Sequence, residues 1–466
     1  MSAPPPLGPP AAAPQGRLLQ LLGVGFGLAG AVGGTIGAGI LRAPGLVAEA
    51  LASPALILAA WLVGGLYALI GALAVAELGA ALPRAGGWTV YARRCFGDGA
   101  GFSVGGLDWL GHCVGLAWEV TTLGQFAAAL LPAGLPLGPG AISSAIALAS
   151  LVGFALLQLL GLRAGSRSQE LLSLVKAVAF LALVAACFLL GGPSRTGIIE
   201  APLLPPLQPP AGALALGLAI VAALQAVIVT YDGWHSPVYF AEEFQDPGRD
   251  LPRSLLAGVA AVITIYLLVN GALLWVLPVP LLAASPLPVA EAAAHLLGPA
   301  SGQLMTGLGL VSLLGLINAT IMSSPRILYG LARDGLLGGG PAALALQQVN
   351  GGGTPVTAVL ATAAVAALLV LSGSFSLLLA VAAFLYVLLY LIGFTCLFVL
   401  RWREPELPRP CRAWGHPWTT AVVWLGSLAF LLTALVGNRG PSLTALALAS
   451  AIPLLYQVLR TGAPPD

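Results

Sequence analysis

Two short runs of this 466-residue sequence place helix-breaking residues inside otherwise apolar stretches. The first is Gly33–Gly39, which reads GGTIGAG, and the second is Thr230–Pro237, which reads TYDGWHSP. A helix interrupted at such a run leaves carbonyl groups at the end of its first half and N–H groups at the start of its second half without partners. The N–H groups can hold an anion and the carbonyl groups a cation. Both runs could therefore bind a ligand that carries both charges.

The position of a backbone group relative to the break predicts which end of a ligand it would bind. The N–H groups of Gly37, Ala38 and Gly39 would hold a carboxylate, and these small residues let a ligand approach the backbone. Carbonyl groups at the ends of the first halves would hold an ammonium group. The predicted binding residues are Thr35, Ile36, Gly37, Ala38, Gly39, Val229, Thr230, Asp232, Gly233 and Trp234.

The stretches that contain these runs predict a membrane protein. Hydrophobic residues make up 58% of the chain and charged residues 8%, whereas a soluble domain is about a quarter charged. Lipid is therefore the expected surrounding of most of the surface. Each of the apolar runs is long enough to cross a hydrocarbon core about 30 Å thick. We predict twelve membrane-spanning helices, at residues 18–50, 55–82, 100–131, 140–161, 170–191, 212–240, 254–277, 301–330, 354–373, 375–400, 417–437 and 441–460.

The distribution of arginine predicts the orientation of these helices. Twelve crossings place both termini on one side of the membrane. If that side is the cytoplasm, the outer loops hold only Arg195 and Arg439, and an excess of positive charge on cytoplasmic loops is the usual arrangement. The inner loops and ends then hold Arg17, Arg84, Arg93, Arg94, Arg163, Arg167, Arg249, Arg253, Arg326, Arg333, Arg401, Arg403, Arg409, Arg412 and Arg460.

The two helix-breaking runs fall in the first and sixth predicted helices. This spacing is typical of two inverted five-helix repeats, with a solute site at the interruptions. A glycine run can also serve close packing between helices, but two runs at matched positions favour breaks. We predict a disordered cytoplasmic N-terminus at 1–16, which is rich in Pro and Ala and does not resemble a signal peptide. The first repeat would cover 17–191, the inverted second repeat 212–400, and a cytoplasmic loop, two helices and a short tail 401–466.

Four segments carry a resemblance to a known family. They are Gly34–Leu41 (GTIGAGIL), Ala76–Gly87 (AEL followed by PRAGG), Tyr231–Trp234 (YDGW) followed by Glu242, Glu243 and Asp246–Pro252 (DPGRDLP), and Arg326–Tyr329 (RILY) followed by Ala332–Gly335 (ARDG). At these segments the sequence resembles the amino acid–polyamine–organocation superfamily of permeases. It looks most like the L-type amino acid transporter branch and its bacterial relatives.

The resemblance implies an all-α, leucine-transporter-type fold that works by alternating access. The function that we expect is secondary transport of neutral L-amino acids, either by proton-coupled symport or by amino acid exchange. A polyamine or cationic amino acid exchanger on the same fold is the alternative, and a non-transporting membrane sensor is a remote one. The sequence contains no HExxH or Gly-x-Ser-x-Gly motif and no nucleotide-binding glycine loop, so we do not expect an enzyme.

Three residues of the second run bear on the choice of substrate. The carboxylate of Asp232 either caps the helix break or binds the ammonium group of a cationic substrate. Bacterial relatives that take small neutral amino acids commonly show the same Tyr-Asp-Gly-Trp run. Val229 stands where many relatives have a gating aromatic residue, and His235 stands where eukaryotic relatives often have Asn, so selectivity cannot be copied from them.

Lys176 is the only lysine of the chain. A lysine can lose its proton when it is desolvated, whereas arginine effectively cannot. We place Lys176 a turn or two from the cytoplasmic end of the fifth helix, and some relatives have a Lys where sodium sits in sodium-coupled members. The functional hypothesis is that Lys176 replaces the coupling ion and can carry the proton. The alternative is a Lys that reaches for the inner lipid headgroups.

Other charged residues inside or beside the predicted helices are open to two interpretations. Asp108 and His112 are four residues apart on the third helix, where they could form a proton relay or a satisfied structural pair. A second group would form an ion-pair network at the inner face, with a structural role. Its predicted members are Glu77, Glu242, Glu243, Arg249 and Arg253, paired with Arg84, Arg326 or Arg333.

The positions of the cysteines and the overall composition limit which partners and cofactors we expect. None of the five cysteines lies in a predicted outer loop, so we expect no disulfide and no metal cluster. The loop Pro132–Gly140 lacks the cysteine through which animal members of the L-type branch bond to a glycoprotein, so we expect no such subunit. We expect no cofactor and no nucleic acid partner. The composition, rich in Ala, Gly, Leu and Arg and poor in Lys, suggests a high-GC bacterium and its inner membrane.

Overall fold

The chain is helical throughout the residues that the structure describes, which are 17–132, 138–192, 207, 209–298, 301–372 and 375–461. In this computed structural model the one β-type pairing found within those ranges is an isolated bridge between Leu22 and Phe244. The predicted all-α class is therefore confirmed. The N-terminal segment 1–16, for which we predict disorder, and residues 133–137 of the loop after the third predicted helix lie outside the described residues.

Eight single helices within the described ranges are long and apolar enough to cross a membrane, and one bent pair makes a ninth if its halves form one span. The bent pair consists of α1 (Val24–Thr35) and α2 (Gly39–Leu51). The eight single helices are α3 (Pro54–Ala81), α6 (Pro139–Leu159), α7 (Leu162–Leu190), α8 (Ala213–Thr230), α9 (Pro247–Val276), α12 (Ser301–Arg333), α15 (Phe375–Arg403) and α16 (Trp418–Gly437).

Three more of the predicted crossings contain helices that are not among these spans. They are α5 (Asp98–Ala128), which carries three acidic residues, α14 (Val356–Leu371), which has 16 residues, and α17 (Arg439–Thr461). A count of twelve crossings therefore stays a prediction. The remaining elements are α4 (Trp88–Phe96), the 3₁₀ helix η2 (Ser236–Glu243), α10 (Val279–Ala284), α11 (Pro288–Leu297) and α13 (Pro341–Leu346).

The boundaries of α7 correct the predicted position of Lys176. This helix begins at Leu162 rather than at residue 170, because its first turns, which contain Arg163 and Arg167, are polar but still helical. Lys176 therefore lies at the middle of the 29-residue helix and not a turn or two from its end. The apolar pattern marks the part of a helix that lipid surrounds, and it misses a polar extension of the same helix.

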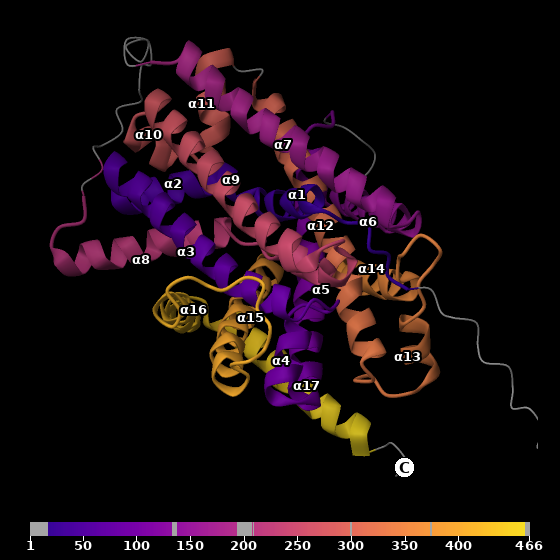
Figure 1. The fold of residues 1–466 in the computed structure, drawn as a ribbon. Coiled ribbons are helices and arrows are strands. Elements are labelled where there is room, and N and C mark those ends of the chain that lie inside the picture. Colours follow the sequence, from indigo (N-terminus) through magenta and orange to yellow (C-terminus); the bar gives the residue numbers. More distant parts are fainter. Residues whose placement is uncertain are drawn as a thin grey trace, which may run out of the picture.

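The broken pair α1–α2 begins inside the helix bundle (Figure 1). α1 is buried over most of its length and packs against α9, α7 and α12. α5 packs against α12, α6, α4 and α15, whereas α3 packs against α9 and α8. Irregular backbone at membrane depth is tolerated where protein surrounds it, and this packing supplies that surrounding for the end of α1.

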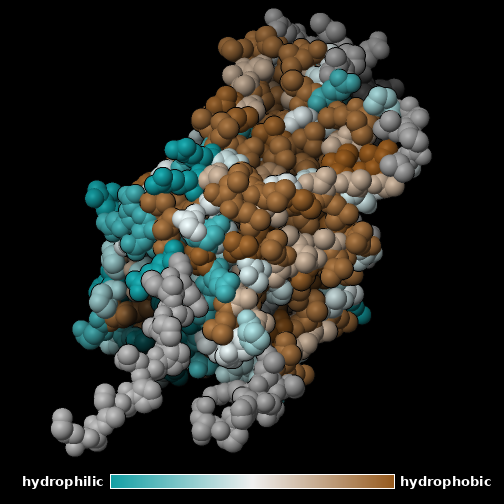
Figure 2. All heavy atoms as spheres, turned by 90° about the vertical axis from the view of Figure 1, so that its right-hand side faces the viewer, coloured by the Kyte–Doolittle hydropathy of each residue, from teal (hydrophilic) through white to brown (hydrophobic). Residues whose placement is uncertain are grey.

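The outer surface of the long helices is apolar. Figure 2 shows a broad hydrophobic face, with hydrophilic side chains gathered toward its lower left. Leu189 of α7 and Leu214 of α8 are each 79% exposed. Hydrocarbon is a favourable surrounding for such side chains and water is not, so the helices expose what a membrane protein would place against lipid.

Candidate binding site at two broken helices

The first predicted helix break lies where the glycine run predicts it. α1 ends at Thr35, α2 begins at Gly39, and the two halves are bent by 50°. Ile36 leaves the helical conformation, with φ −75° and ψ 89°. The N–H groups of Gly37, Ala38 and Gly39 have no acceptor among the described residues, whereas the N–H of Leu41 donates to the carbonyl of Ala38 at 3.2 Å. The start of α2 therefore offers these three N–H groups to an anion.

The second break also lies where the sequence predicts it. α8 ends at Thr230, and the chain makes a turn before η2 begins at Ser236. Gly233 has a φ of +100°, which L-residues with a side chain rarely adopt. The hydroxyl of Ser236 donates to the carbonyl of Gly233 at 2.8 Å and so closes the turn. The second half of this broken helix is a 3₁₀ helix, a feature that the sequence pattern does not indicate.

The two breaks are in direct contact with one another. A Cβ atom on Gly233 would lie 2.1 Å from the carbonyl oxygen of Gly34, and a Cβ atom on Gly34 would lie 2.7 Å from the carbonyl oxygen of Gly233. α2 packs against α8, and α1 packs against η2. The bridge between Leu22 and Phe244 joins the start of α1 to the end of η2. The two broken helices therefore run past each other in opposite directions.

Tyr266 of α9 joins the ends of both first halves, and the sequence analysis missed it. Its hydroxyl lies 3.1 Å from the carbonyl oxygen of Thr35 and 3.0 Å from that of Thr230, and its side chain is fully buried. One hydroxyl proton can be donated to only one of the two oxygens at a time, and each carbonyl has a second lone pair. Both carbonyl groups therefore keep an acceptor site for a cation. No local sequence motif indicates a role for Tyr266, because its partners lie in other helices.

Replacing Tyr266 by phenylalanine should lower the uptake of substrate by about three- to tenfold, the effect of one hydrogen bond of ordinary strength. The ring would stay in place, while the carbonyl groups of Thr35 and Thr230 would lose the hydroxyl that holds them together. Tyr231→Phe is the matched control, because its buried hydroxyl donates to Trp61 and not to a break carbonyl. Equal rates for the two variants would show that the hydroxyl of Tyr266 has no part in the site.

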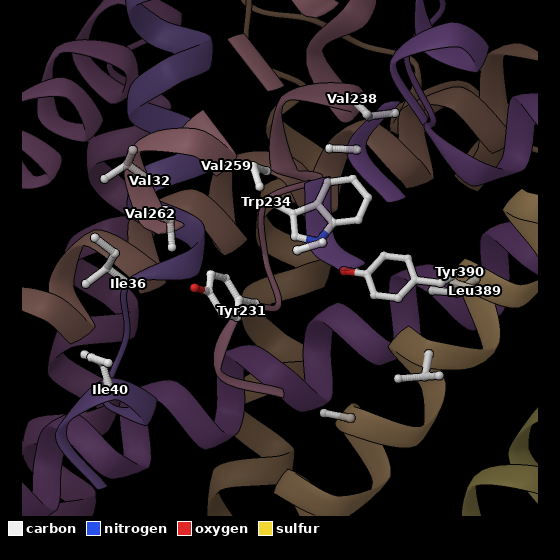
Figure 3. Close-up of a cluster of buried hydrophobic side chains, with 14 of the residues drawn as sticks. Val32, Ile36, Ile40, Tyr231, Trp234, Val238, Val259, Val262, Leu389 and Tyr390 are labelled. Atoms are coloured by element: carbon white, nitrogen blue, oxygen red, sulfur yellow. The ribbon is translucent and has the colours of Figure 1, made fainter. Parts of the chain in front are cut away.

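The side chain of Asp232 points to α15. Its carboxylate accepts a hydrogen bond from Tyr390, whose hydroxyl also lies 2.6 Å from Nδ1 of His235. Trp234 stacks on the ring of Tyr390, with the centroids 5.5 Å apart and the planes at 11° (Figure 3). The second break is thereby connected to α15 through three of its side chains, those of Asp232, Trp234 and His235. The Asp232 side chain is 27% exposed.

The structure brings most of the predicted binding residues together, with two exceptions. Gly39 lies against Thr230, since a Cβ atom there would be 3.2 Å from its side chain, and Thr35 shares Tyr266 with Thr230. The carbonyl of Val229 accepts the N–H of Asp232 at 3.3 Å, so it takes part in the turn itself. Trp234 is buried against α3 and α15 rather than against the first break. The rest of the predicted set is Ile36, Gly37, Ala38, Asp232 and Gly233, which form the two interruptions.

Lys176 supports the end of α1. It is fully buried, and its Nζ donates to the carbonyl of Gly33 at 2.9 Å. One turn earlier, Ser173 donates to the carbonyl of Ala29 at 2.8 Å. The last carbonyl groups of a helix lack intrahelical partners and carry a partial negative charge, which a lysine stabilises. The position and burial of Lys176 contradict the alternative in which it reaches for lipid headgroups.

Glu119 of α5 is a second buried charge that faces this region. Its Oε1 accepts a hydrogen bond from Thr320 of α12 at 2.9 Å, while its Oε2 has no partner among the described residues. The described part of the chain contains no carboxylate within 4.0 Å of Nζ of Lys176, so Glu119 forms no direct ion pair with it. Glu119 was not among the predicted site residues, although an acidic residue inside an apolar span is a signal of function.

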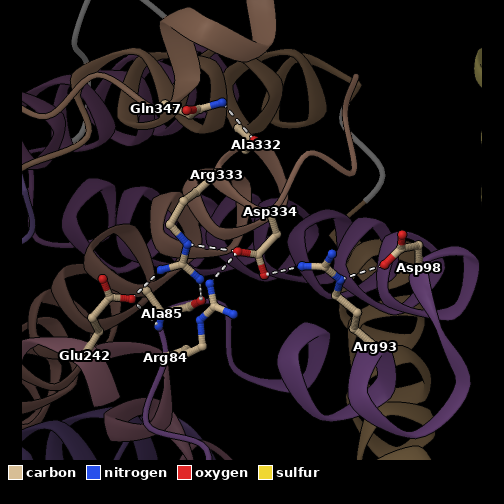
Figure 4. A network of polar contacts seen from close by, with 9 residues as sticks. All are labelled: Arg84, Ala85, Arg93, Asp98, Glu242, Ala332, Arg333, Asp334 and Gln347. Carbon is tan, nitrogen blue, oxygen red and sulfur yellow. Dashed lines mark hydrogen bonds and ion pairs between the residues drawn. The ribbon is translucent and has the colours of Figure 1, made fainter. Parts of the chain in front are cut away.

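The structure contains the central part of the predicted inner ion-pair network. Arg333 binds Glu242, and it also donates to Asp334 at 2.9 Å (Figure 4). Asp334 also forms ion pairs with two further arginines, Arg84 at 2.9 Å and Arg93 at 3.1 Å. The segment that follows α3, the end of α12 and the end of η2 are therefore held together by charges at one end of the bundle.

A more deeply buried pair lies beside this network. Arg326 binds both carboxylate oxygens of Glu243, at 2.9 and 3.1 Å, and donates to the carbonyl of Met322 at 2.6 Å. Its guanidinium also lies over the ring of Phe240, 4.8 Å from the centroid. Both charged side chains are almost fully buried, at 1% and 0% exposed. The pairing of Glu243 with Arg326 is confirmed.

Three members of the predicted network were wrong. Glu77 binds Arg401 at 2.6 Å and Arg409 at 3.1 Å instead, and so joins α3 to the end of α15 and the loop after it. Arg249 and Arg253 make no ion pair with any other described residue. Sequence reasoning could place these charges on the same side of the membrane, but it could not tell which helices are neighbours there.

Replacing Glu243 by glutamine should destabilise the protein strongly, because it leaves the charge of Arg326 buried without a counter-ion, at a cost of about 3–5 kcal/mol. Glu242→Gln is the matched control, since its pair with Arg333 is partly exposed and contributes on the order of 1 kcal/mol or less. The melting temperatures of the two purified variants in the same detergent measure the difference. A melting temperature of Glu243→Gln equal to that of Glu242→Gln would contradict the assignment.

Comparison with known proteins agrees with this geometry. The serine/threonine exchanger SteT of Bacillus subtilis is 26% identical over 421 residues, which are 90% of this chain and 92% of that protein. The Asc-type amino acid transporter 1 of Mus musculus is 29% identical over 86% of this chain and 73% of its own. The large neutral amino acids transporter small subunit 2 of Homo sapiens is 28% identical over 82% of this chain and 70% of its own. The family model described as amino acid permease matches residues 18–457, and the chain therefore belongs to the amino acid permease family, whose members are membrane transporters and not enzymes.

Proposed function

We propose that the protein moves neutral L-amino acids across the membrane as a secondary transporter, by amino acid exchange or by proton-coupled symport. The observation that carries this proposal is the contact between the two broken helices at Gly34 and Gly233. It brings together one break with unpaired N–H groups and the carbonyl groups of Thr35 and Thr230, each of which keeps an acceptor site beside Tyr266. An amino acid is a zwitterion and needs both kinds of group. The similarity to SteT, a serine/threonine exchanger, and to the Asc-type and large neutral transporters supports a neutral substrate.

The proposed site assigns one role to each break. The N–H groups of Gly37, Ala38 and Gly39 hold the substrate carboxylate at the start of α2, where the helix dipole favours a negative charge. The carbonyl groups of Thr35, Ile36, Thr230 and Asp232 face the ammonium group. Val229, Gly233 and Trp234 shape the second break around the ligand.

A cationic substrate remains the second candidate because of Asp232. A partly exposed carboxylate beside the break could bind an ammonium group of a polyamine or of a basic side chain. The hydrogen bond from Tyr390 to that carboxylate supports the neutral assignment instead, since the group already has a donor from the protein.

The proposed architecture has twelve crossings, with 17–191 and 212–400 as inverted five-helix repeats and 401–466 outside them. The opposed directions of the two broken helices support it, because inversion of one repeat reverses its first helix. We place the protein in the inner membrane of a bacterium, with both termini in the cytoplasm, on the basis of its composition and its arginine distribution. We expect no disulfide-linked subunit.

Uptake into proteoliposomes of the purified protein tests the proposed function. Labelled neutral amino acids, arginine and putrescine are offered to empty vesicles and to vesicles preloaded with the same unlabelled compound, with and without an inward proton gradient. Uptake that needs preloading indicates exchange, and uptake driven by the gradient indicates symport. Uptake of arginine or putrescine alone would reject the neutral assignment and make Asp232 the ammonium ligand.

A further inference from the structure

A carboxylate and a histidine form a buried pair on α5, and the site described above does not use them. Asp108 is 0% and His112 4% exposed. Nδ1 of His112 lies 2.9 Å from the carbonyl oxygen of Asp108 and 3.1 Å from its Oδ1. Both neighbours are acceptors, so Nδ1 carries a proton whether or not the ring is charged. Oδ2 of Asp108 has no partner in the described part of the chain.

The Asp108–His112 pair is connected to the second broken helix. The hydroxyl of Tyr239, in η2, donates to Oδ1 of Asp108 at 2.9 Å. The ring of Tyr239 stands edge-on to His112, with the centroids 4.9 Å apart. Three to four residues after Tyr239, the same short helix carries Glu242 and Glu243, which bind the arginines of α12. The pair therefore joins α5 to the half of the broken helix that ends in the ion-pair network.

The other groups around the pair come from a few elements. Tyr386 of α15 stands edge-on to His112 at 5.5 Å and donates to the carbonyl of Gly111 at 3.3 Å. The described parts of α6 and α14, which also pack against α5, contain no ionisable side chain, and Arg326 of α12 is bound to Glu243. The same elements carry further titratable side chains. Within the described residues they include Asp98, Cys113 and Glu119 on α5, Tyr91, Arg93, Arg94 and Cys95 on α4, Tyr329 and Arg333 on α12, Tyr390, Cys396, Arg401 and Arg403 on α15, Arg439 and Tyr456 on α17, and Asp232 and His235 at the second break.

Among the described residues, neither Asp108 nor His112 forms an ion pair with any group outside the pair, so the charge on the pair is set first by its own protons. With one proton beyond that on Nδ1, the pair is neutral overall, either as carboxylate and imidazolium or as carboxylic acid and imidazole. Without that proton it carries one net negative charge at a buried position. A buried net charge is costly, and separation of α5 from η2, which lets water reach Asp108, lowers the cost.

We propose that the Asp108–His112 pair binds one proton as a unit and that this proton holds η2 against α5. Loss of the proton to water loosens η2 and, with it, the end of the broken helix that binds the arginines. This inference rests on the proposed transport function, since it places the pair at a contact that must open when a substrate leaves on that side. The Asp108–His112 pair is a separate proton site from Lys176, which binds α1. The alternative is a permanent structural pair with no titration.

Hydrogen exchange of residues 236–243, followed by mass spectrometry, tests the proposal without any substrate. The measurement is made on the purified protein at about pH 6 and about pH 8, on either side of the ordinary histidine pKa of about 6.5, and is corrected for the intrinsic pH dependence of exchange. In the wild type, exchange of this segment should be about tenfold faster at the higher pH, the effect of a difference of one unit between the pKa of the pair in the closed and in the opened state. The exchange measurement can be interpreted even if the protein shows no transport in vesicles. The proposed transport function and the proposed proton site can therefore be rejected independently.

Three variants and a control distinguish the proposal from a structural pair. Asp108→Asn and His112→Gln should remove the pH dependence, and either one suffices if the other does not fold. Tyr239→Phe should exchange fast at both pH values. Glu291→Gln is the control, because Glu291 and His295 form a partly exposed pair of the same spacing on α11, 3.2 Å apart, and it should behave as the wild type. A wild type with equal exchange at both pH values, or an Asp108→Asn variant that keeps the full pH dependence, would overturn the proposal.

Discussion

Replacing Gly233 by alanine should reduce transport by about 100-fold or more while the protein still reaches the membrane. Gly233 has a φ of +100°, and a Cβ atom there would lie 2.1 Å from the carbonyl oxygen of Gly34 and 2.6 Å from its carbonyl carbon. A residue with a side chain held in such a conformation costs on the order of 1–3 kcal/mol. The overlap with the Gly34 peptide adds to this cost, because the obstacle is backbone and cannot rotate away. The two breaks would be forced apart at the place where the proposed site requires contact.

The measurement is the initial rate of uptake by proteoliposomes that contain equal amounts of folded protein, judged by size-exclusion chromatography. Gly217→Ala is the matched control. Gly217 lies in α8, the helix that leads to this break, and a Cβ atom there meets no other atom within 4 Å, so alanine should be neutral or slightly stabilising. Uptake by Gly233→Ala within a factor of a few of Gly217→Ala would show that the contact between the breaks is not required.

The helix breaks were predictable because their signal is local. Glycine and proline act through the conformations they allow or forbid, and three glycines within five residues weaken a helix wherever it packs. The run from Thr230 to Pro237 likewise contains a glycine and a proline close together. Both breaks lie in the structure where these residues stand.

Residues that act through distant partners could not be found in this way. The side chain of Tyr266 meets Thr35 across 231 positions of sequence, and Glu119 meets Thr320 across 201. Which helices are neighbours is decided by packing of the whole bundle, on which single-residue patterns carry little information. For the same reason Glu77 was assigned to the correct end of the protein but to the wrong arginines.

The boundaries of the membrane-spanning helices show a different limit of prediction from sequence. Apolar periodicity locates the part of a helix that lies in lipid, so it placed the start of the fifth helix too late and Lys176 too near its end. The structure places Lys176 at mid-helix against the end of α1. A shift of about two turns changes the expectation for this residue, because a lysine at mid-membrane cannot reach the headgroups without leaving its partner.

Replacing Lys176 by methionine should lower uptake by at least about tenfold. Methionine has nearly the same length and no charge, so the change leaves the carbonyl of Gly33 buried without its donor, at a cost of about 1–3 kcal/mol. It also removes the positive charge that stabilises the end of α1 beside the proposed ammonium site. Ser173→Ala is the matched control, because it removes a hydrogen bond to the same helix one turn away but no charge, and it should cost about threefold or less.

Lysine and arginine at position 176 separate the two roles that a cation can have there. Arginine keeps the charge but effectively cannot release a proton. If Lys176 carries the coupled proton, Lys176→Arg should keep exchange between preloaded and external amino acid and lose the stimulation by an imposed proton gradient. If Lys176 is a fixed substitute for a coupling ion, the wild type should ignore the gradient and the arginine variant should exchange at a comparable rate. A gradient response that survives in Lys176→Arg or Lys176→Met would exclude Lys176 as the proton carrier and direct attention to the Asp108–His112 pair, whose protons lie at the contact between α5 and η2.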